Sequence, residues 1–351
     1  MNVLSLFDGM SCGRLALEKA GVHVTNYYAS EIDKYAMKVA KANYPDTIHI
    51  GDVTQVEGRD LPKIDLLLGG SPCQGFSFSG KRLDFEDPRS KLFFEYVRLL
   101  WATKPRWFLL ENVRMTQECQ DVISEHLGVK PRPINSNLVS AQNRYRLYWT
   151  NIPFDDPEDK GVVLKDILEG GFVDRDKAHC LDANYFKGGN LKQYFEKHRR
   201  QLVFSKEGLC HVGEADLNGP QIIKRVYHPD GKGPTLTTCT GGHREPKVLI
   251  FQRPRGNNSG GFRALDGKVP TISTSEWQHN NHLTDGKYWR KLTPKECERL
   301  QTVPDGYTDH VSNTQRYKML GNGWTVDVIK HIFEQGLFDW ATLNMKEVKY
   351  A

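Results

Sequence analysis

The sequence predicts an α/β protein: a doubly wound, mostly parallel sheet, with a smaller and irregular β-rich domain placed late in the chain. Over the first 150 residues, short apolar runs alternate with helical patterns, as in parallel sheets that helices cover on both faces. From about residue 155 helical periodicity fades and Gly, Thr, His and Asn become frequent; after residue 290 it returns. The chain therefore leaves the α/β domain and comes back to it.

The individual elements follow from apolar runs and from the turn residues that bound them. At the far end, Thr293-Pro294-Lys295-Glu296 is typical of a helix start, with a Thr cap, Pro at the first position and Glu three residues after the cap. We expect strands at 3–7, 24–30, 64–68 and 107–110, and helices at 12–20, 34–43, 91–101 and 326–333.

The change of texture predicts three segments: 1–154 and 290–351 forming one domain, and 155–289 forming another. Within the second, residues 230–238 and 266–274 resemble each other, and Cys180-Leu181-Asp182-Ala183-Asn184-Tyr185 is a fainter relative. These repeats predict turn-plus-strand units of the β-rich domain. Chance reuse of a common hairpin start is the alternative.

Composition narrows the class of protein. No apolar run is long enough to cross a bilayer, and the N-terminus lacks the pattern of a signal peptide. Seven scattered cysteines without a Cys-x-x-Cys pair argue against a disulfide framework and against a metal site, and favour a reducing, cytoplasmic compartment. The net charge of +5 is compatible with a polyanion partner but does not require one. Without a coiled-coil pattern, we expect a monomer.

The first strand runs into a glycine-containing turn at residues 7–13, which is a cofactor position in doubly wound folds. The turn lacks the Gly-x-Gly-x-x-Gly pattern that holds a pyrophosphate. Glu31 ends the second strand, where it can accept hydrogen bonds from ribose hydroxyls, and Asp52 follows the third strand candidate, where it can accept from an adenine amino group. Two acidic residues at strand ends, without a phosphate-binding loop, favour a nucleoside ligand that carries no phosphate, such as S-adenosylmethionine. The alternative is that Glu31 and Asp52 are simply solvated acids at strand ends.

Cys73 follows the strand at 64–68 on a Pro turn, with glycines on both sides. That places it at the crevice where such sheets bind ligands. A nucleophilic cysteine reacts as the thiolate and needs a polar or electropositive surrounding, which Lys81, Arg82 and Arg89 can supply. Cys73 is therefore the candidate nucleophile, and a buried spectator thiol is the alternative.

Several short blocks together resemble the cytosine-5 DNA methyltransferases, in the order in which that family carries them. The turn at residues 7–9 and Trp324 look most like the de novo branch of animals, whereas Asn322 and the long middle segment look like bacterial and phage enzymes. The blocks are Phe7-Asp8-Gly9, Pro72-Cys73-Gln74, Glu111-Asn112-Val113, Gln142-Asn143-Arg144-Tyr145-Arg146 and Gly321-Asn322-Gly323.

The resemblance implies an S-adenosylmethionine-dependent methyltransferase fold and transfer of a methyl group to carbon 5 of a flipped cytosine in duplex DNA. It assigns attack on carbon 6 to Cys73 and contacts with N3 and the amino group to Glu111. Arg146 is expected to hold O2, and Arg144 to support the catalytic loop or its neighbours. The expected cofactor pocket comprises Phe7, Asp8, Gly9, Glu31, Asp52, Val53, Pro72, Leu92, Asn322 and Trp324, although Trp324 as a plain core residue is the alternative.

The middle domain is expected to recognise the DNA target, with the basic stretch Lys187 to Lys206 as the candidate for phosphate contacts. Two other functions stay open at this point: a transfer-RNA cytosine-5 methyltransferase and a non-catalytic DNA-binding member of the family. The sequence also leaves open whether a cognate restriction endonuclease accompanies the protein in the same cell.

Overall fold

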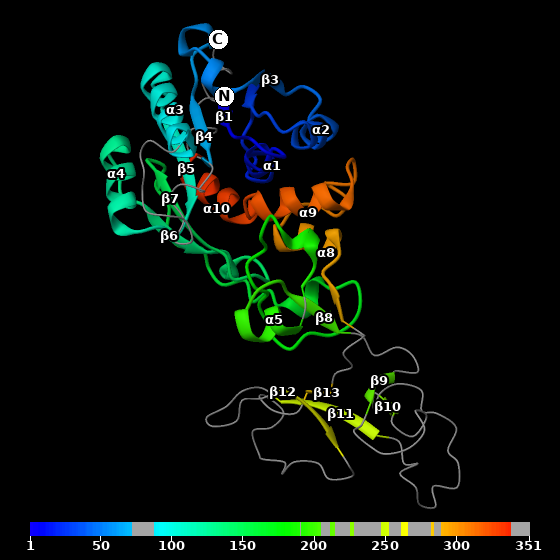
Figure 1. The fold of residues 1–351 in the computed structure, drawn as a ribbon. Coiled ribbons are helices and arrows are strands. Elements are labelled where there is room, and N and C mark those ends of the chain that lie inside the picture. Colours follow the sequence, from blue (N-terminus) through cyan, green and yellow to red (C-terminus); the bar gives the residue numbers. More distant parts are fainter. Residues whose placement is uncertain are drawn as a thin grey trace, which may run out of the picture. The chain divides into compact units, whose positions relative to one another are not determined.

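A computed structural model describes residues 1–71, 88–189, 191–204 and 289–337, together with five short strands between residues 211 and 283. At the centre lies a seven-stranded sheet in the order β3-β2-β1-β4-β5-β7-β6 (Figure 1). The five strands from β3 to β5 are parallel, whereas β7 runs antiparallel to both β5 and β6. The strands are β1 Asn2–Leu6, β2 Asn26–Ser30, β3 Ile48–Gly51, β4 Leu66–Gly69, β5 Trp107–Val113, β6 Arg132–Asn135 and β7 Tyr145–Thr150.

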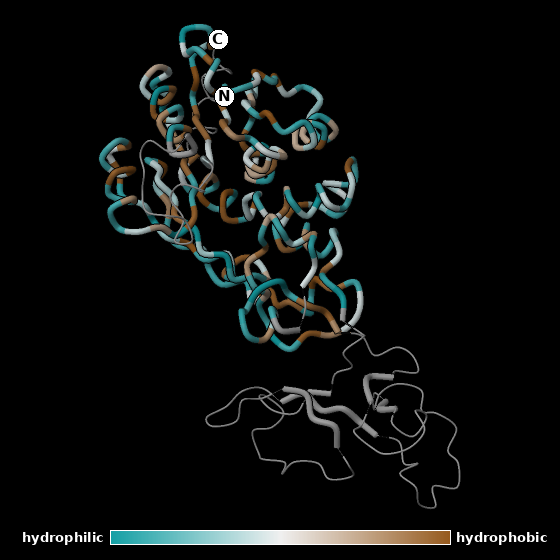
Figure 2. The backbone as a smooth tube through the Cα atoms, in the orientation of Figure 1, coloured by the Kyte–Doolittle hydropathy of each residue, from teal (hydrophilic) through white to brown (hydrophobic). Residues whose placement is uncertain are grey.

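Helices cover both faces of this sheet. Alternate residues of β1, such as Leu4 and Leu6, are buried with α3 and α4, while α1 packs against α10 on the other side (Figure 1). Figure 2 shows hydrophobic residues along the central strands and hydrophilic residues on the outer loops. The helices of this unit are α1 Cys12–Lys19, α2 Lys34–Asn43, α3 Pro88–Thr103, α4 Gln117–Leu127, α8 Pro294–Leu300, α9 Asn313–Asn322 and α10 Val326–Gly336.

The order of the strands reverses direction at β1, because β2 and β3 extend to one side of it and β4 and β5 to the other. In open parallel sheets a ligand binds beyond the carboxyl ends of the strands at such a reversal. The loops after β1, β2, β4 and β5 therefore meet where a ligand site is expected. Burial fixes this geometry: Leu66, Leu67 and Leu68 of β4 are fully buried.

The chain divides into two compact units. The first comprises residues 1–167, 175–188 and 293–351, and the second comprises 168–174 and 189–292. The predicted second domain began at residue 155, so this division assigns 155–167 and 175–188 to the α/β unit. The predicted boundary between the catalytic domain and the target-recognition domain, at residue 155, stays a prediction.

The second unit is rich in strands, in agreement with the predicted fold class. A helix, α5 Leu191–Lys197, precedes β8 Leu202–Phe204, which pairs antiparallel with β14 Trp289–Lys291. Tyr194, Leu202 and Phe204 form a small buried cluster with Phe172 and Phe195. A further sheet contains β9 His211–Glu214, β10 Arg225–Tyr227, β11 Lys247–Gln252, β12 Gly261–Leu265 and β13 His282–Leu283.

One predicted strand unit is wrong. Residues 180–185 form a turn that leads into a 3-10 helix at Tyr185–Lys187 and belong to the α/β unit. Their backbone lies against Gly321, where an added Cβ would come within 2.3 Å of the Asp182 carbonyl group. Packing against α9 therefore determines the conformation of this segment. The two stronger repeats, 230–238 and 266–274, lie outside the described residues.

The helix start predicted at residue 293 is confirmed. The Thr293 hydroxyl accepts from the backbone N–H of Glu296 at 3.2 Å, and the Glu296 carboxylate accepts from the backbone N–H of Thr293 at 2.8 Å. Two backbone donors that the helix itself leaves unpaired are thereby satisfied.

Removing this cap is expected to destabilise the protein. Thr293→Ala should lower the free energy of unfolding by about 1 kcal/mol, because an orphan backbone donor loses its acceptor. Ser312→Ala is the matched control, since Ser312 precedes α9 without making a side-chain cap bond. Urea unfolding of both variants checks the prediction, and equal effects of the two changes would contradict it.

Candidate active site

A cavity of about 390 Å³ lies at the carboxyl ends of the parallel strands, entirely within the α/β unit. It brings together residues that are far apart in the sequence. Of the residues predicted for the cofactor pocket, those lining the cavity are Phe7, Asp8, Gly9, Glu31, Asp52, Val53, Leu92, Asn322 and Trp324. Glu111, Arg144 and Arg146 line the same cavity. Pro72 and Cys73 lie outside the described residues.

The turn after β1 has an unusual backbone. Phe7, Gly9 and Ser11 have φ angles of 58°, 60° and 63°, in the left-handed region that residues with a side chain rarely adopt. Two contacts hold the turn: the Gly9 N–H donates to Glu31 Oε2 at 2.8 Å, and the Tyr307 hydroxyl donates to the Met10 carbonyl at 2.8 Å. Backbone strain of this kind persists where the surrounding structure enforces it, commonly at ligand sites.

The carboxylate of Glu31 is fixed by backbone donors. Besides the bond from Gly9, its Oε1 accepts from the N–H groups of Ile32 and Asp33, at 2.8 Å each. Asp52, at the end of β3, accepts from the N–H and the hydroxyl of Thr54 through Oδ1, at 3.0 Å each. Backbone N–H groups and the Thr54 hydroxyl thus orient both acids, and both line the cavity.

Asp8 lies deeper and has a different environment. Its Oδ2 accepts from the Ser11 hydroxyl at 2.5 Å and its Oδ1 from the Tyr27 hydroxyl at 2.7 Å. Burial raises the pKa of the Asp8 carboxyl, and the hydrogen bonds from Ser11 and Tyr27 only partly oppose that effect. Burial therefore shifts the equilibrium of the Asp8 carboxyl towards its neutral form, relative to an exposed Asp.

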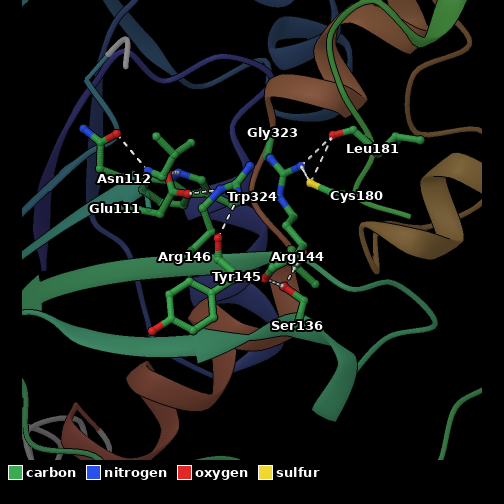
Figure 3. A network of polar contacts seen from close by, with 12 residues as sticks. Glu111, Asn112, Ser136, Arg144, Tyr145, Arg146, Cys180, Leu181, Gly323 and Trp324 are labelled. Atoms are coloured by element: carbon green, nitrogen blue, oxygen red, sulfur yellow. Dashed lines mark hydrogen bonds and ion pairs between the residues drawn. The ribbon is translucent and has the colours of Figure 1, made fainter. Parts of the chain in front are cut away.

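Glu111 occupies the other side of the cavity, near the end of β5. Its Oε1 pairs with Arg146 Nε at 2.9 Å, and its Oε2 accepts from the indole N–H of Trp324 at 3.0 Å (Figure 3). The Arg146 side chain comes from β7, which pairs with β5. Burial lowers the pKa of Arg146, but the combined attraction of Glu111, Cys180 and Tyr148 outweighs burial and raises it, so the cation is maintained.

Arg144, two residues away, has a different set of contacts. It is fully buried, and its guanidinium donates to the carbonyl oxygens of Leu181, Gly321 and Gly323 at 2.9, 3.1 and 2.8 Å (Figure 3). Its hydrogen bonds therefore hold backbone that comes from two distant segments. This arrangement fits the supporting role expected for Arg144 rather than contact with a substrate.

Besides the predicted nucleophile Cys73, which lies outside the described residues, the chain has a cysteine in the cavity wall. Cys12 lies in the cavity wall, where burial raises the pKa of its thiol to about 12. Such a thiol is protonated at neutral pH and is a poor nucleophile. Cys73 is two residues beyond Ser71, which Asn112 anchors through bonds from its amide to the Ser71 hydroxyl and carbonyl oxygens, at 3.3 and 3.5 Å.

Sequence reasoning missed three of these features. The sequence predicts no separate role for Asn112 within the Glu111-Asn112-Val113 motif. Its contact with Ser71 arises because β5 pairs with β4. Ile32 lines the cavity although its side chain is 74% exposed, and an apolar residue directly after a strand-end acid is the signal that could have found it. Lys318 also lines the cavity and pairs with Asp33 at 2.8 Å across 285 residues of sequence, which no local pattern reveals.

A sheet with this strand order, with acids at the ends of β2 and β3 and a buried carboxylate–guanidinium pair beside them, defines an α/β domain of the methyltransferase class. The family model described as C-5 cytosine-specific DNA methylase matches residues 1–126 and 136–337. The chain belongs to this family and is a DNA cytosine-5 methyltransferase.

Similar proteins match nearly the whole of this chain. Type II methyltransferase M.NlaX of Neisseria lactamica is 30% identical, with 95% of each chain covered. Orphan methyltransferase M.SPBetaI of Bacillus phage SPbeta is 28% identical, with 95% of this chain and 97% of the relative covered. Among solved structures, EhMeth of Entamoeba histolytica superposes with a TM-score of 0.60 at 15% identity, covering 97% of this chain and 98% of that one, which shows the shared fold.

In the described part of the chain, no helix is long and apolar enough to cross a membrane. Within that same part, no group of three or more His, Cys, Asp or Glu side chains is arranged to hold a metal ion.

The raised pKa of Asp8 predicts how stability depends on pH. A carboxyl whose pKa is higher in the folded state contributes stability below its unfolded pKa of about 3.9 and loses that contribution as pH rises through the folded value. The free energy of unfolding of the wild-type protein, minus that of Asp8→Asn, should therefore decrease as pH rises above about 4.

Urea unfolding across a pH series measures this difference. Asp46→Asn is the matched control, because the hydrogen bond from Arg14 lowers the pKa of the exposed Asp46 carboxyl, so the corresponding difference should increase with pH below about 4 and stay level above it. A flat or rising curve for Asp8→Asn would show that Asp8 is ionised in the folded protein.

Proposed function

We propose that this DNA cytosine-5 methyltransferase uses S-adenosylmethionine to methylate a cytosine flipped out of a specific duplex sequence, with Cys73 as the nucleophile. The observation that carries the proposal is the Glu111–Arg146 ion pair at the cavity that also contains Glu31 and Asp52. One cavity thus provides acceptors for a nucleoside and a charged pair suited to a polar ring. Both parts are needed for methyl transfer to a base.

The residues at the carboxyl ends of β1, β2 and β3 fit the proposed cofactor. Glu31 is held so that its carboxylate can also accept from vicinal ribose hydroxyls, and Asp52 can accept from the amino group of an adenine. The exposed Ile32 offers an apolar surface for the base. When bound, the cofactor supplies an electrophilic methyl group on a sulfonium.

Carbon 5 of cytosine is a weak nucleophile until carbon 6 has been attacked. The Cys73 thiolate would add to carbon 6, and the displaced electron pair would move into the ring towards N3 and O2. Glu111 would contact N3 and the exocyclic amino group and favour protonation of N3 as the negative charge develops. Carbon 5, now part of an enamine, accepts the methyl group. Loss of the carbon 5 proton to a base, departure of the Cys73 thiolate and return of the N3 proton to Glu111 would then restore the ring.

The two arginines would divide the remaining tasks. Arg146 carries a maintained positive charge next to Glu111, so it can stabilise charge that develops at O2. Arg144 would act through the backbone that it holds, since its bonds to Gly321 and Gly323 flank Asn322 on the cavity wall. Arg144 is thus a positioning residue in this proposal.

Duplex DNA must expose its base for this chemistry, because carbon 5 is inaccessible to the enzyme inside the stack. The second unit would recognise the target sequence. Its helix α5 belongs to the basic stretch Lys187 to Lys206, which we propose contacts phosphates. A cognate restriction endonuclease, a monomeric state and a cytoplasmic location remain expectations from the sequence.

Replacing the proposed nucleophile tests the mechanism directly. Cys73→Ala should reduce transfer of labelled methyl groups to duplex DNA by at least roughly a thousandfold, as expected when a covalent nucleophile is removed. It should also abolish the covalent adduct that the wild-type protein forms with DNA carrying 5-fluorocytosine. Cys119→Ala is the control, since Cys119 is buried in α4 and contacts Thr116. An adduct retained by Cys73→Ala would refute the assignment.

The substrate class is tested by competition. Unlabelled duplex DNA containing the target sequence should suppress methyl transfer to labelled duplex DNA, whereas transfer RNA at the same concentration should leave it unchanged. Preferential methylation of transfer RNA would favour the RNA-modifying alternative. Cofactor binding in a calorimeter without turnover on any DNA would favour a non-catalytic member.

A further inference from the structure

The indole of Trp324 contacts Glu111 directly. Its Nε1 donates to Glu111 Oε2 at 3.0 Å, while Arg146 Nε engages the other oxygen at 2.9 Å. The two donors come from chain positions on opposite sides of the inserted unit. A carboxylate held at both oxygens has a fixed plane, and that plane decides where its remaining lone pairs point.

Two glycines border the indole, and the absence of a side chain at Gly70 makes room for it. An added Cβ at Gly70 would lie 2.9 Å from Trp324 Nε1 and 3.3 Å from Glu111 Oε2. An added Cβ at Gly13 would lie 3.4 Å from Trp324 Cζ3. The ring therefore lies against the start of α1 and the residue after β4, and it reaches Glu111 from there (Figure 3).

The backbone around Trp324 is also fixed. The carbonyl of Gly323 accepts from Arg144 at 2.8 Å, and the hydroxyl of Thr325 donates to Gln301 Oε1 at 3.0 Å. The Thr325 hydroxyl in turn accepts from Ser136 at 3.0 Å. Residues on both sides of Trp324 are thus tied to the α/β unit, so the indole has little freedom to leave Glu111.

We propose that Trp324 is a positioning residue that orients Glu111 for the target base, in addition to forming part of the cavity wall. This inference rests on the role proposed above for Glu111. Loss of the indole N–H is therefore expected to slow the chemical step. Cofactor affinity should change little as long as an aromatic ring remains at residue 324.

Trp324→Phe removes the donor and keeps an aromatic ring. Methyl transfer in a single turnover, at saturating DNA and cofactor, should slow by about tenfold, consistent with loss of one hydrogen bond to a charged group. The dissociation constant for S-adenosylhomocysteine, measured by calorimetry, should stay within about twofold of wild type, because one ring replaces another. Weakened cofactor binding with an unchanged single-turnover rate would overturn the inference and leave Trp324 as a cavity wall alone.

Gly70→Ala provides a second route, because the new methyl group forces the indole away from Glu111. It should slow the single-turnover rate to a similar extent, and combining it with Trp324→Phe should add little, since both changes break the same bond. Gly170→Ala is the control: among the described residues, a Cβ there meets nothing within 4 Å. Thermal melting confirms that each variant is folded, and additive losses in the double variant would contradict the inference.

Glu111→Gln separates this inference from the proposed function. A Glu111→Gln variant with the wild-type rate would refute the role of Glu111, and the role of Trp324 with it. A slow Glu111→Gln variant alongside a wild-type rate for Trp324→Phe would refute the positioning role alone. If Trp324 acts through Glu111, adding Trp324→Phe to Glu111→Gln should cause no further loss.

Discussion

The buried guanidinium of Arg144 holds the candidate site together. A cation removed from water is costly unless its donors are satisfied, and here the two terminal nitrogens bond to carbonyl oxygens of Leu181, Gly321 and Gly323, whereas Nε has no hydrogen-bond partner among the described residues. Burial and the neighbouring charge of Arg146 both lower the pKa of Arg144, which shows how unfavourable the location is without these bonds. The segments before and after the inserted unit are thereby fastened to β7.

This attachment explains how one cavity can draw on both ends of the chain. The turn after β1 and the strand-end acids come from the first 52 residues, whereas Asn322 and Trp324 come from the returning segment. The Tyr307 hydroxyl bonded to Met10 links the same two regions. Because β5 and β7 are paired in register, Glu111 and Arg146 meet as a consequence of the sheet, without any loop to place them.

Much of the α/β unit could be predicted because its signals are local. Apolar runs located β1, β2, β4 and β5, the pattern at 34–43 matched α2 at both ends, and the capping residues at Thr293 acted as expected. The strand-end acids could be placed because parallel strands end on one edge. The contacts of Arg144 and of Trp324 could not be predicted, since they join residues more than 170 positions apart. The segment at 180–185 misled because its turn residues resemble those of the repeats, while packing on Gly321 determines its fold.

The ladder between β8 and β14 has a consequence for how specificity can change. Phe204 pairs with Trp289, so the chain enters and leaves residues 205–288 at neighbouring points. The entropy of closing a loop grows only slowly with its length, by about 0.6 kcal/mol for each doubling. Because β8 and β14 hold the two ends of this segment together, residues 205–288 can be lengthened, shortened or exchanged with little change in the stability of the α/β unit. Under the proposed role of the second unit in target recognition, replacing this segment would change the target sequence.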